Sequence, residues 1–361
     1  MDLRKNIIIY KNMAKKVFGN DIGKWTELKL EYIRKYLGAY SNILNFAGFK
    51  EYCFIDAFAG SGLCKTKKTK ETKKGSTLIS LSIEPPFTKY FFIELDQNKC
   101  DCLKNIVSGD FSKRNVVIKN GDCNKEIDSI LKQFNENTPF MALLDPQAGD
   151  LYWDTIRKIG ERSKAEALIN FPFGMAISRY MPLEEKKEIN MEMENKIDLI
   201  FGCKDWKNVY RERKKNRISP RVAREKYLDI YLTNLISIGF KYYAVKNIKN
   251  SIGNHIYYLI YATKNLRGLE KMKDEFVKKE PTRNTLFFLQ DLKIEVYKVF
   301  NGTVNISLDK ILDRLLTGKH CYRKQDFKEV LVSLEKEGKL IRNNKRKGAR
   351  SFNEKELFSL I

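Results

Sequence analysis

The residues best suited to chemistry lie in the stretch 54–62, which reads Phe-Ile-Asp-Ala-Phe-Ala-Gly-Ser-Gly. An apolar run from Tyr52 to Ile55 predicts a buried strand that ends at the acid Asp56. Gly60 and Gly62 follow it, and because glycine has no Cβ the backbone of this turn can approach a ligand closely. A turn of this kind at the carboxyl end of a parallel strand is typical of nucleotide-type cofactor sites. The alternative is a tight strand-to-helix turn in some other α/β protein.

A second acid, Glu94, ends the next apolar run, 90–93. In a doubly wound sheet an acid at this point accepts hydrogen bonds from ribose hydroxyls, and Asp96 is the competing candidate. The spacing from Asp56 exceeds the usual distance of about twenty residues, and the loop expected over 65–74, with its six lysines, accounts for much of the difference. Lys65 stands where a dinucleotide fingerprint has its third glycine, which disfavours NAD.

The stretch 54–62 resembles motif I of the class I S-adenosylmethionine (SAM)-dependent methyltransferases, an acid-x-Phe-x-Gly-x-Gly turn. The resemblance implies SAM as the cofactor. It also implies that an acid after the third strand, here in the Asn-Gly-Asp turn that follows 116–118, contacts the adenine. The cofactor-binding residues that it implies are Asp56, Phe58, Gly60, Ser61, Gly62, Glu94 and Asp122.

A fourth apolar run, 140–144, ends in Asp145-Pro146-Gln147-Ala148-Gly149. In the same resemblance this is motif IV, where methyl transfer takes place. Methyltransferases that modify base amino groups carry Asp or Asn, then two prolines and an aromatic residue. Asp145 and Pro146 match that pattern and are the catalytic candidates, whereas Gln147 and Ala148 depart from it. Phe171 or Phe173 could supply the missing stacking surface, with packing as the equal alternative.

The elements that must position these residues alternate between strands and helices. Further strands are predicted at 167–172, 241–248 and 255–263, and helices at 97–107, 124–134, 153–162, 227–238 and 269–276. The helix near 76–83 is expected to begin with a hydroxyl N-cap in Gly75-Ser76-Thr77. This order predicts an α/β fold, a class I methyltransferase Rossmann-like sheet.

Ahead of the sheet, residues 1–48 form a predicted N-terminal helical extension. Apolar residues recur at steps of three and four from Trp25 to Leu44, which predicts an amphipathic helix that packs on the sheet. The sheet domain is expected to span 49–281, with Pro281 at its boundary.

Residues 282–361 are predicted to form a separate module. Helices are expected at 290–300, 307–316 and 323–337, followed by a strand at 339–342, a basic hairpin tip and a return strand from Ser351-Phe352. Three helices and a basic hairpin predict a winged helix, a class that contacts either nucleic acid or protein. The expected nucleic-acid contacts are Lys345, Arg346, Lys347 and Arg350 at the tip, with Arg213 and Lys214 from the charge-dense segment 183–226.

The chain has 361 residues and a net charge of +23. A basic excess this large favours an anionic partner, most simply nucleic acid, although lysine-rich usage from an AT-rich genome offers another explanation. Seven cysteines without a Cys-x-x-Cys pair predict reduced thiols in a cytoplasmic protein. With two histidines, no metal site is expected. No apolar run approaches membrane-spanning length, so no membrane partner is expected.

A narrower resemblance spans nearly the whole chain. Trp25 with Lys29-Leu30 and Tyr36, the motif I stretch, Gly75-Ser76 and Leu144-Asp145-Pro146 look like the three-Cys-motif partner proteins of bacteria. That resemblance implies co-operation with a three-cysteine iron–sulfur neighbour. It implies no substrate, and Gly149 comes one position later than in the family pattern.

Two functional hypotheses follow. The first is a SAM-dependent methyltransferase that acts on RNA or DNA, on a base amino group held by Asp145 and the Pro146 carbonyl. The second is a non-catalytic SAM-binding scaffold that docks to nucleic acid or to the three-cysteine partner. The departures at Gln147 and Ala148 favour the second hypothesis, and the complete set of cofactor residues favours the first.

Overall fold

A computed structural model describes residues 22–67, 69–174, 177–183, 188–250, 253–277, 286–343 and 351–361. The chain forms two compact units. The first extends to Lys241 and includes Asn247–Lys264, and the second comprises Tyr242–Lys246 and Asn265–Ile361. The predicted boundary at 281/282 falls outside the described residues.

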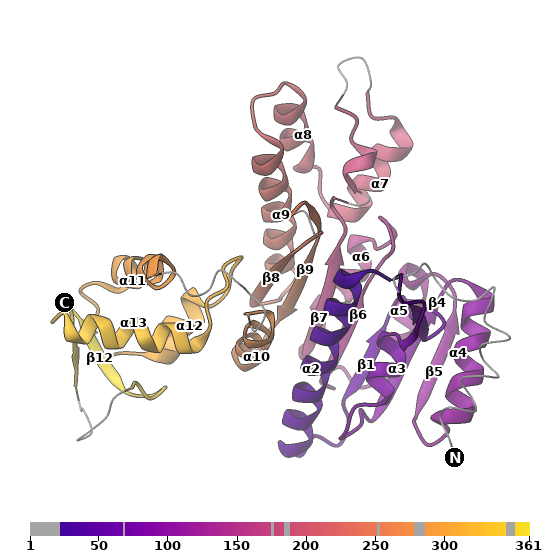
Figure 1. Ribbon diagram of the computed structural model, residues 1–361, viewed down its shortest axis with the longest axis horizontal. Helices are drawn as coiled ribbons and strands as arrows, with labels where there is room; N and C mark the ends of the chain where they lie inside the picture. Colours follow the sequence, from indigo (N-terminus) through magenta and orange to yellow (C-terminus); the bar gives the residue numbers. More distant parts are fainter. Residues whose placement is uncertain are drawn as a thin grey trace. The chain divides into compact units, whose positions relative to one another are not determined.

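A seven-stranded sheet has the strand order β5-β4-β1-β6-β7-β9-β8 (Figure 1), and its first six strands belong to the first unit. Its first five strands are parallel, and β9 runs antiparallel to β7. The predicted α/β fold with a mostly parallel, Rossmann-like sheet is therefore confirmed. The strands are β1 (Cys53–Asp56), β4 (Lys89–Glu94), β5 (Val116–Asn120), β6 (Phe140–Leu144), β7 (Ala165–Phe171), β8 (Tyr242–Lys249) and β9 (His255–Thr263).

The strands β1, β6 and β7 are buried along their whole length, as expected for the centre of a parallel sheet that is covered on both faces. In the register, Asp56 lies opposite Leu143 of β6 and Phe92 of β4. The order of connection reverses between β1 and β6, and the crevice at such a switch point is where doubly wound sheets bind ligands. The carboxyl ends of β1, β4 and β6 meet there.

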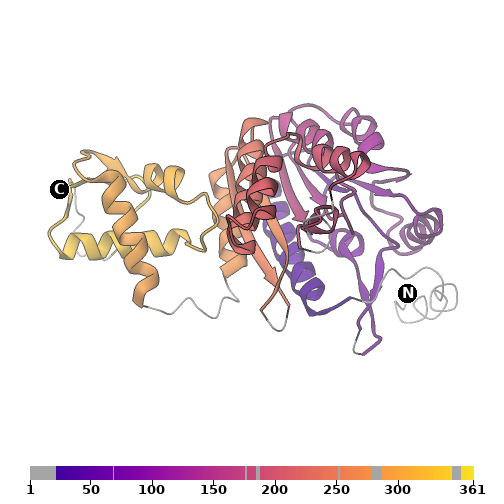
Figure 2. The same ribbon diagram turned by 90° about the horizontal axis from the view of Figure 1, so that it is seen from above.

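Helices cover both faces of this sheet (Figure 2). On β7 the side chain of Glu166 contacts Tyr36 of α2 (Lys24–Phe46). Phe171, an odd number of residues further along β7, stacks on Tyr231 of α9 (Pro220–Ser237) with ring centroids 4.4 Å apart. Because successive side chains of a strand alternate between faces, α2 and α9 lie on opposite sides of the sheet. The expected packing of the N-terminal helix on the sheet is confirmed.

The other helices of this unit are α3 (Ser76–Leu81), α4 (Gln97–Asp110), α5 (Cys123–Leu131), α6 (Trp153–Glu161), the 3-10 turn η1 (Ile177–Tyr180), α7 (Met191–Phe201) and α8 (Trp206–Lys214). The first four of them follow the predicted order, whereas the last three elements, η1, α7 and α8, were not predicted.

The lysine-rich segment predicted as a loop is a hairpin instead. Strands β2 (Leu63–Lys65) and β3 (Thr72–Lys74) pair antiparallel and project from the first unit (Figure 2). One of its lysines is paired at the surface: the ammonium group of Lys73 lies 2.8 Å from the carboxylate of Glu27 on α2.

The second unit contains the expected helices and a small sheet of order β10-β12-β11. The return strand begins at Leu357, so its predicted start at Ser351-Phe352 is wrong: Phe352 is buried before the strand begins. The winged-helix assignment stays a prediction, because the hairpin tip lies outside the described residues. The elements are α10 (Leu266–Val277), α11 (Leu286–Phe300), β10 (Ile306–Ser307), α12 (Leu308–Leu315), α13 (Lys324–Lys336), β11 (Leu340–Arg342) and β12 (Leu357–Leu360).

All seven cysteines are free thiols. Among the helices that the structure describes, none combines the length and the apolar character needed to cross a membrane.

Candidate functional site

The glycine turn after β1 depends on glycine at both positions. Gly60 has φ +62° and Gly62 has φ +81°, which is the left-handed region that side chains disfavour. A Cβ on Gly62 would lie 3.0 Å from Leu78 and Leu103, so the turn also packs closely there. A Cβ on Gly60 would meet nothing within 4 Å. Gly60 therefore leaves open space beside the backbone, as a ligand cradle requires.

Asp56 stabilises this turn through hydrogen bonds. Its side chain is fully buried, and it accepts hydrogen bonds from the backbone N–H of Phe58 at 3.2 Å and from the Ser76 hydroxyl at 2.6 Å. Burial raises the pKa of Asp56 to about 7, against the lowering effect of these two bonds. The predicted hydroxyl cap on α3 is wrong: Gly75 is the N-cap, and the Ser76 hydroxyl binds Asp56 instead.

Glu94, at the end of β4, is hydrogen-bonded to the same turn. One carboxylate oxygen accepts from the N–H of Gly60 at 2.7 Å, and the other accepts from the N–H of Asp96 at 2.8 Å. The rival Asp96 caps α4, accepting from the backbone N–H groups of Asn98 and Lys99. Both acids thus have structural contacts, and of the two Glu94 is the one bonded to the glycine turn.

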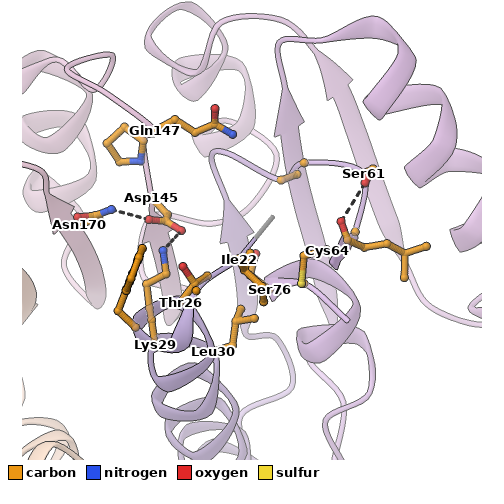
Figure 3. Close-up of a pocket in the computed structure, with 18 of the residues that line it drawn as sticks. Ile22, Thr26, Lys29, Leu30, Ser61, Cys64, Ser76, Asp145, Gln147 and Asn170 are labelled. Atoms are coloured by element: carbon orange, nitrogen blue, oxygen red, sulfur yellow. Dashed lines mark hydrogen bonds and ion pairs between the residues drawn. The ribbon is translucent and has the colours of Figure 1, made fainter. Parts of the chain in front are cut away.

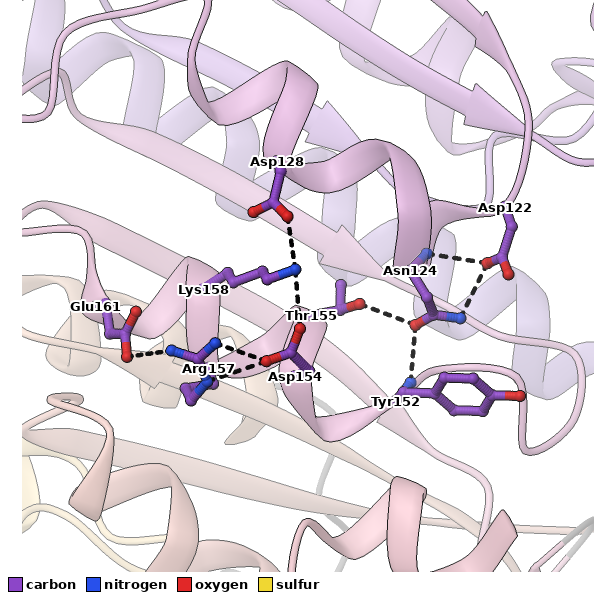
Figure 4. A network of polar contacts seen from close by, with 9 residues as sticks. All are labelled: Asp122, Asn124, Asp128, Tyr152, Asp154, Thr155, Arg157, Lys158 and Glu161. Atoms are coloured by element: carbon purple, nitrogen blue, oxygen red, sulfur yellow. Dashed lines mark hydrogen bonds and ion pairs between the residues drawn. The ribbon is translucent and has the colours of Figure 1, made fainter. Parts of the chain in front are cut away.

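Asp122 is the N-cap of α5, where its Oδ1 accepts from both nitrogens of Asn124 at 2.9 Å (Figure 4). Asn124 in turn joins α5 to the segment after β6. Its Nδ2 donates to the Asp150 carbonyl at 2.8 Å, and its Oδ1 accepts from the N–H of Tyr152 and the hydroxyl of Thr155. This network fixes the orientation of Asp122, and its Oδ2 makes no hydrogen bond within the described part of the chain.

A pocket of about 360 Å³ lies at the carboxyl edge of the sheet (Figure 3). The glycine turn and motif IV, which are far apart in sequence, both line it. Of the predicted site residues it takes in Gly60, Ser61, Gly62, Asp145 and Pro146. The predicted residues that do not line it are Asp56, Phe58, Glu94 and Asp122.

Asp145 is the most strongly bonded side chain of this pocket. Its Oδ2 forms an ion pair with Lys29 Nζ at 2.5 Å, and its Oδ1 accepts from Asn170 Nδ2 at 2.8 Å (Figure 3). The side chain of Lys29 is 8% exposed and that of Asp145 is 23% exposed. A lysine from α2, an acid from β6 and an amide from β7 therefore form one polar chain in the pocket wall.

Two buried polar atoms of the pocket residues have no hydrogen-bond partner in the described part of the structure. They are Asn170 Oδ1 and the hydroxyl of Tyr257, a β9 residue. The ammonium group of Lys29 lies 5.7 Å from the centroid of the Tyr257 ring. Buried polar atoms without partners are uncommon in folded proteins and indicate a place where a ligand or water completes the bonding.

No pocket role was predicted for Lys29, Asn170 or Tyr257. Of the three, only Lys29 is unusual in the sequence, because it falls on the apolar stripe of the first helix, where a lysine is not expected. Nothing local in the sequence distinguishes Asn170 or Tyr257 from other residues of buried strands.

Motif IV departs from the base-methyltransferase pattern at Gln147 and Ala148, and of these two residues Gln147 lines the pocket. Phe171 does not supply a stacking surface, because its ring is 1% exposed and packs on Tyr231. Phe173 lines a different cavity.

The remaining nucleic-acid candidates separate into two sets. Lys345, Arg346, Lys347 and Arg350 lie outside the described residues. Arg213 lines the same cavity as Phe173, whereas the neighbouring Lys214 forms an ion pair with Glu188 at 2.6 Å.

No protein-family model matches the chain, and no curated protein sequence matches it. The three-Cys-motif resemblance therefore gains no support. Solved structures with a similar layout exist at low identity. A protein from Legionella pneumophila is 9% identical with a TM-score of 0.41, covering 65% of this chain and 85% of that one.

Two further structures are of proteins that are named for an activity or were solved with a cofactor. Trm1 from Pyrococcus horikoshii, solved with S-adenosyl-L-methionine, is 10% identical with a TM-score of 0.40, covering 93% of this chain and 91% of that one. An rRNA methylase from Streptococcus thermophilus is 10% identical with a TM-score of 0.33, covering 66% and 95%. Similarity at this level does not extend to activity.

Proposed function

We propose that the protein is a SAM-dependent methyltransferase that acts on nucleic acid. The observation that carries the proposal is the pocket at the switch point of the sheet, which is lined both by the glycine turn Gly60–Gly62 and by Asp145-Pro146. A cofactor cradle and a catalytic acid must share one cavity for group transfer, because the reacting atoms have to lie close together.

The residues around the turn fit SAM. The open space at Gly60 admits the methionine part of the cofactor beside the backbone. Glu94 keeps acceptor capacity for ribose hydroxyls, since each carboxylate oxygen can accept two hydrogen bonds and each has one here. Asp122 offers its Oδ2 to the adenine amino group. When bound, SAM supplies an electrophilic methyl group with a good leaving group.

We assign the target amino group to the wall formed by Asp145, Pro146 and Asn170. An ionised carboxylate only accepts hydrogen bonds, so Asp145 can orient an N–H donor. The unpartnered Asn170 Oδ1 offers a second acceptor beside it. Lys29 holds Asp145 in place, and the target group adds to this ion pair or displaces it. Two acceptors side by side suit an amino group better than a hydroxyl group.

Nucleic acid as the substrate follows from the net charge of +23 and from the basic residues predicted at the hairpin tip of the second unit. The narrower three-Cys-motif hypothesis, with its iron–sulfur partner, stays untested. The non-catalytic scaffold is the second candidate, and the occupation of Asp145 by Lys29 is the observation that favours it.

Asp145→Ala separates these two functions. If Asp145 orients the target group, the variant should lose about a hundredfold or more in turnover, because a positioned catalytic group has been removed. Binding of the demethylated product of SAM should persist, since the glycine turn is intact. Turnover is read from methylated nucleosides by mass spectrometry, and product binding is read by calorimetry.

Gly60→Arg is the matched control, since its side chain fills the open space at the turn and should abolish product binding. A scaffold would show the opposite pattern. A cellular phenotype that survives Asp145→Ala but disappears in Gly60→Arg would contradict the enzyme assignment.

A further inference from the structure

A second cavity, of about 450 Å³, lies in the first unit beside the end of β7. Pro172 lines the pocket that contains Asp145, and the next residue, Phe173, lines this second cavity. None of the residues Gly60–Gly62 or Asp145-Pro146 lines the second cavity. The two cavities are therefore adjacent at residues 172 and 173 but have separate walls.

Two arginines line the second cavity, Arg213 of α8 and Arg224 of α9. Arg213 Nη1 donates to the Asn216 side chain at 3.0 Å, and Arg224 Nε donates to the Tyr258 hydroxyl at 3.2 Å. Neither guanidinium group forms an ion pair with another residue of the described ranges. No acid is among the described residues that line the cavity, and two positive charges in such a wall suit an anionic ligand.

Two lysines near these arginines are held by acids instead, with Lys214 paired to Glu188 and Lys226 paired to Glu212, each at 2.6 Å. Neither of these lysines lines the second cavity. The two arginines of the cavity therefore differ from these two lysines both in position and in having no acid as a partner among the described residues.

The cavity wall also contains two aromatic rings and a buried histidine nitrogen. The rings of Phe173 and Tyr227 lie 4.8 Å apart. His255 Nδ1 bonds the Asn247 side-chain oxygen at 2.8 Å, so Nδ1 carries the proton and Nε2 is left as an acceptor. Nε2 is buried and has no partner in the described part of the chain. Burial lowers the pKa of His255 to about 4, which keeps this ring neutral.

We propose that this cavity binds one nucleotide of the nucleic-acid substrate, with its phosphate at Arg213 and Arg224 and its base against Phe173. The base has a flat face for the aromatic wall and an N–H edge for His255 Nε2. Because the catalytic pair Asp145-Pro146 does not line the cavity, the bound nucleotide is not the one that reacts. The inference rests on the proposed function in taking nucleic acid as the substrate.

The test measures binding of a short, fluorescently labelled single-stranded RNA of mixed sequence to the full-length protein by anisotropy at several salt concentrations. Arg213→Ala and Arg224→Ala should each bind about tenfold more weakly, since each loses a charge-assisted contact. Replacing both arginines should also reduce the slope of log K against log salt by about 0.7, because both contact the same phosphate. Lys226→Ala is the matched control: it removes one positive charge two residues from Arg224, outside the cavity, and should change affinity by less than about twofold.

His255→Phe gives an independent readout, because it removes a neutral acceptor. Its affinity should fall while the salt slope stays at the wild-type value. Equal losses in Arg224→Ala and Lys226→Ala would mean that general surface charge binds the RNA, and would overturn the proposal. Absence of RNA binding by the wild-type protein would overturn it too.

Calorimetry with the demethylated product of SAM distinguishes this failure from that of the proposed function. If the product does not bind but the RNA affinity still depends on both arginines, the cavity assignment stands and the methyltransferase assignment fails. The reverse pattern overturns the cavity assignment alone. Melting curves of all variants confirm that they are folded.

Discussion

Side chains of helix α2 contact two carboxylates of the sheet domain, and the two contacts differ in kind. Near its start, Lys29 pairs with Asp145 at the end of β6. Two turns later, Tyr36 donates to Glu166 near the start of β7. The two carboxylates lie on neighbouring strands and face the same helix. One has a cation as its partner and the other has hydroxyl groups.

Glu166 is sealed. It is bonded by three hydroxyl groups, those of Tyr36, Tyr261 at 2.6 Å and Thr263 at 3.1 Å, and burial raises its pKa despite these bonds. Asp145, in contrast, reaches the pocket and has a charged partner. A buried acid that is held by hydroxyl groups fastens the helix to the sheet, whereas Asp145 lines a cavity in which a ligand can compete with its lysine.

Glu166→Ala should cause the largest effect on stability. It removes the carboxylate that accepts from three buried hydroxyl groups and opens a cavity between α2 and the sheet, so the free energy of unfolding should fall by about 4 kcal/mol. Chemical denaturation followed by circular dichroism measures the loss.

Glu166→Gln is the control, because it keeps one acceptor oxygen and nearly the same volume. It should recover more than half of the loss. If both variants unfold at the wild-type denaturant concentration, Glu166 does not fasten α2, and the distinction between the two acids disappears.

Asp56 extends the comparison, because it is buried like Glu166 but lies beside the pocket. Its pKa is raised to about 7 from 3.8, so the folded protein retains the proton where the unfolded chain has released it. The stability that this proton contributes is present at low pH and is lost as the pH rises through about 7. From about pH 5 to about pH 7 the wild type should therefore lose about 2 kcal/mol more than Asp56→Asn does.

Denaturation series at the two pH values measure this difference. Parallel curves for the wild type and Asp56→Asn would show that Asp56 is ionised in the folded protein throughout the range. In that case its bonds to Ser76 and Phe58 outweigh its burial.

The fold could be predicted because its strands are apolar runs that end in acids. The runs before Asp56, Glu94 and Asp145 are local signals, and parallel strands bring their ends to one edge. The hairpin of β2 and β3 was missed since its strands are short and rich in lysine, which has a low propensity for strands.

The pocket could be predicted only in part. Lys29 is marked by its place on an apolar stripe, but its partner Asp145 lies 116 residues away, and no local pattern joins them. The same applies to Asn170, whose strand was predicted but whose contact was not. The pairing of side chains across elements is set by tertiary packing, which periodicity does not encode.

The smallest effect tests the comparison within one strand. Tyr257 and Tyr261 both belong to β9 and are separated by an even number of residues, so both side chains are on the face of the sheet that α2 covers. The Tyr261 hydroxyl bonds Glu166, whereas the Tyr257 hydroxyl has no partner in the described part of the chain.

Tyr261→Phe should cost about 1 kcal/mol of folding stability, the net value of one buried hydrogen bond. Tyr257→Phe should be neutral or stabilise by up to about 1 kcal/mol, since it removes an unsatisfied buried hydroxyl and keeps the ring near Lys29. Thermal melts of the two variants measure both signs. If the two variants lose equal stability, the Tyr257 hydroxyl is hydrogen-bonded in solution, and the pocket wall is then as fully bonded as the contact around Glu166. If the signs differ, the hydroxyl is held ready for a ligand, and Tyr257→Phe should then weaken substrate binding while leaving the fold intact.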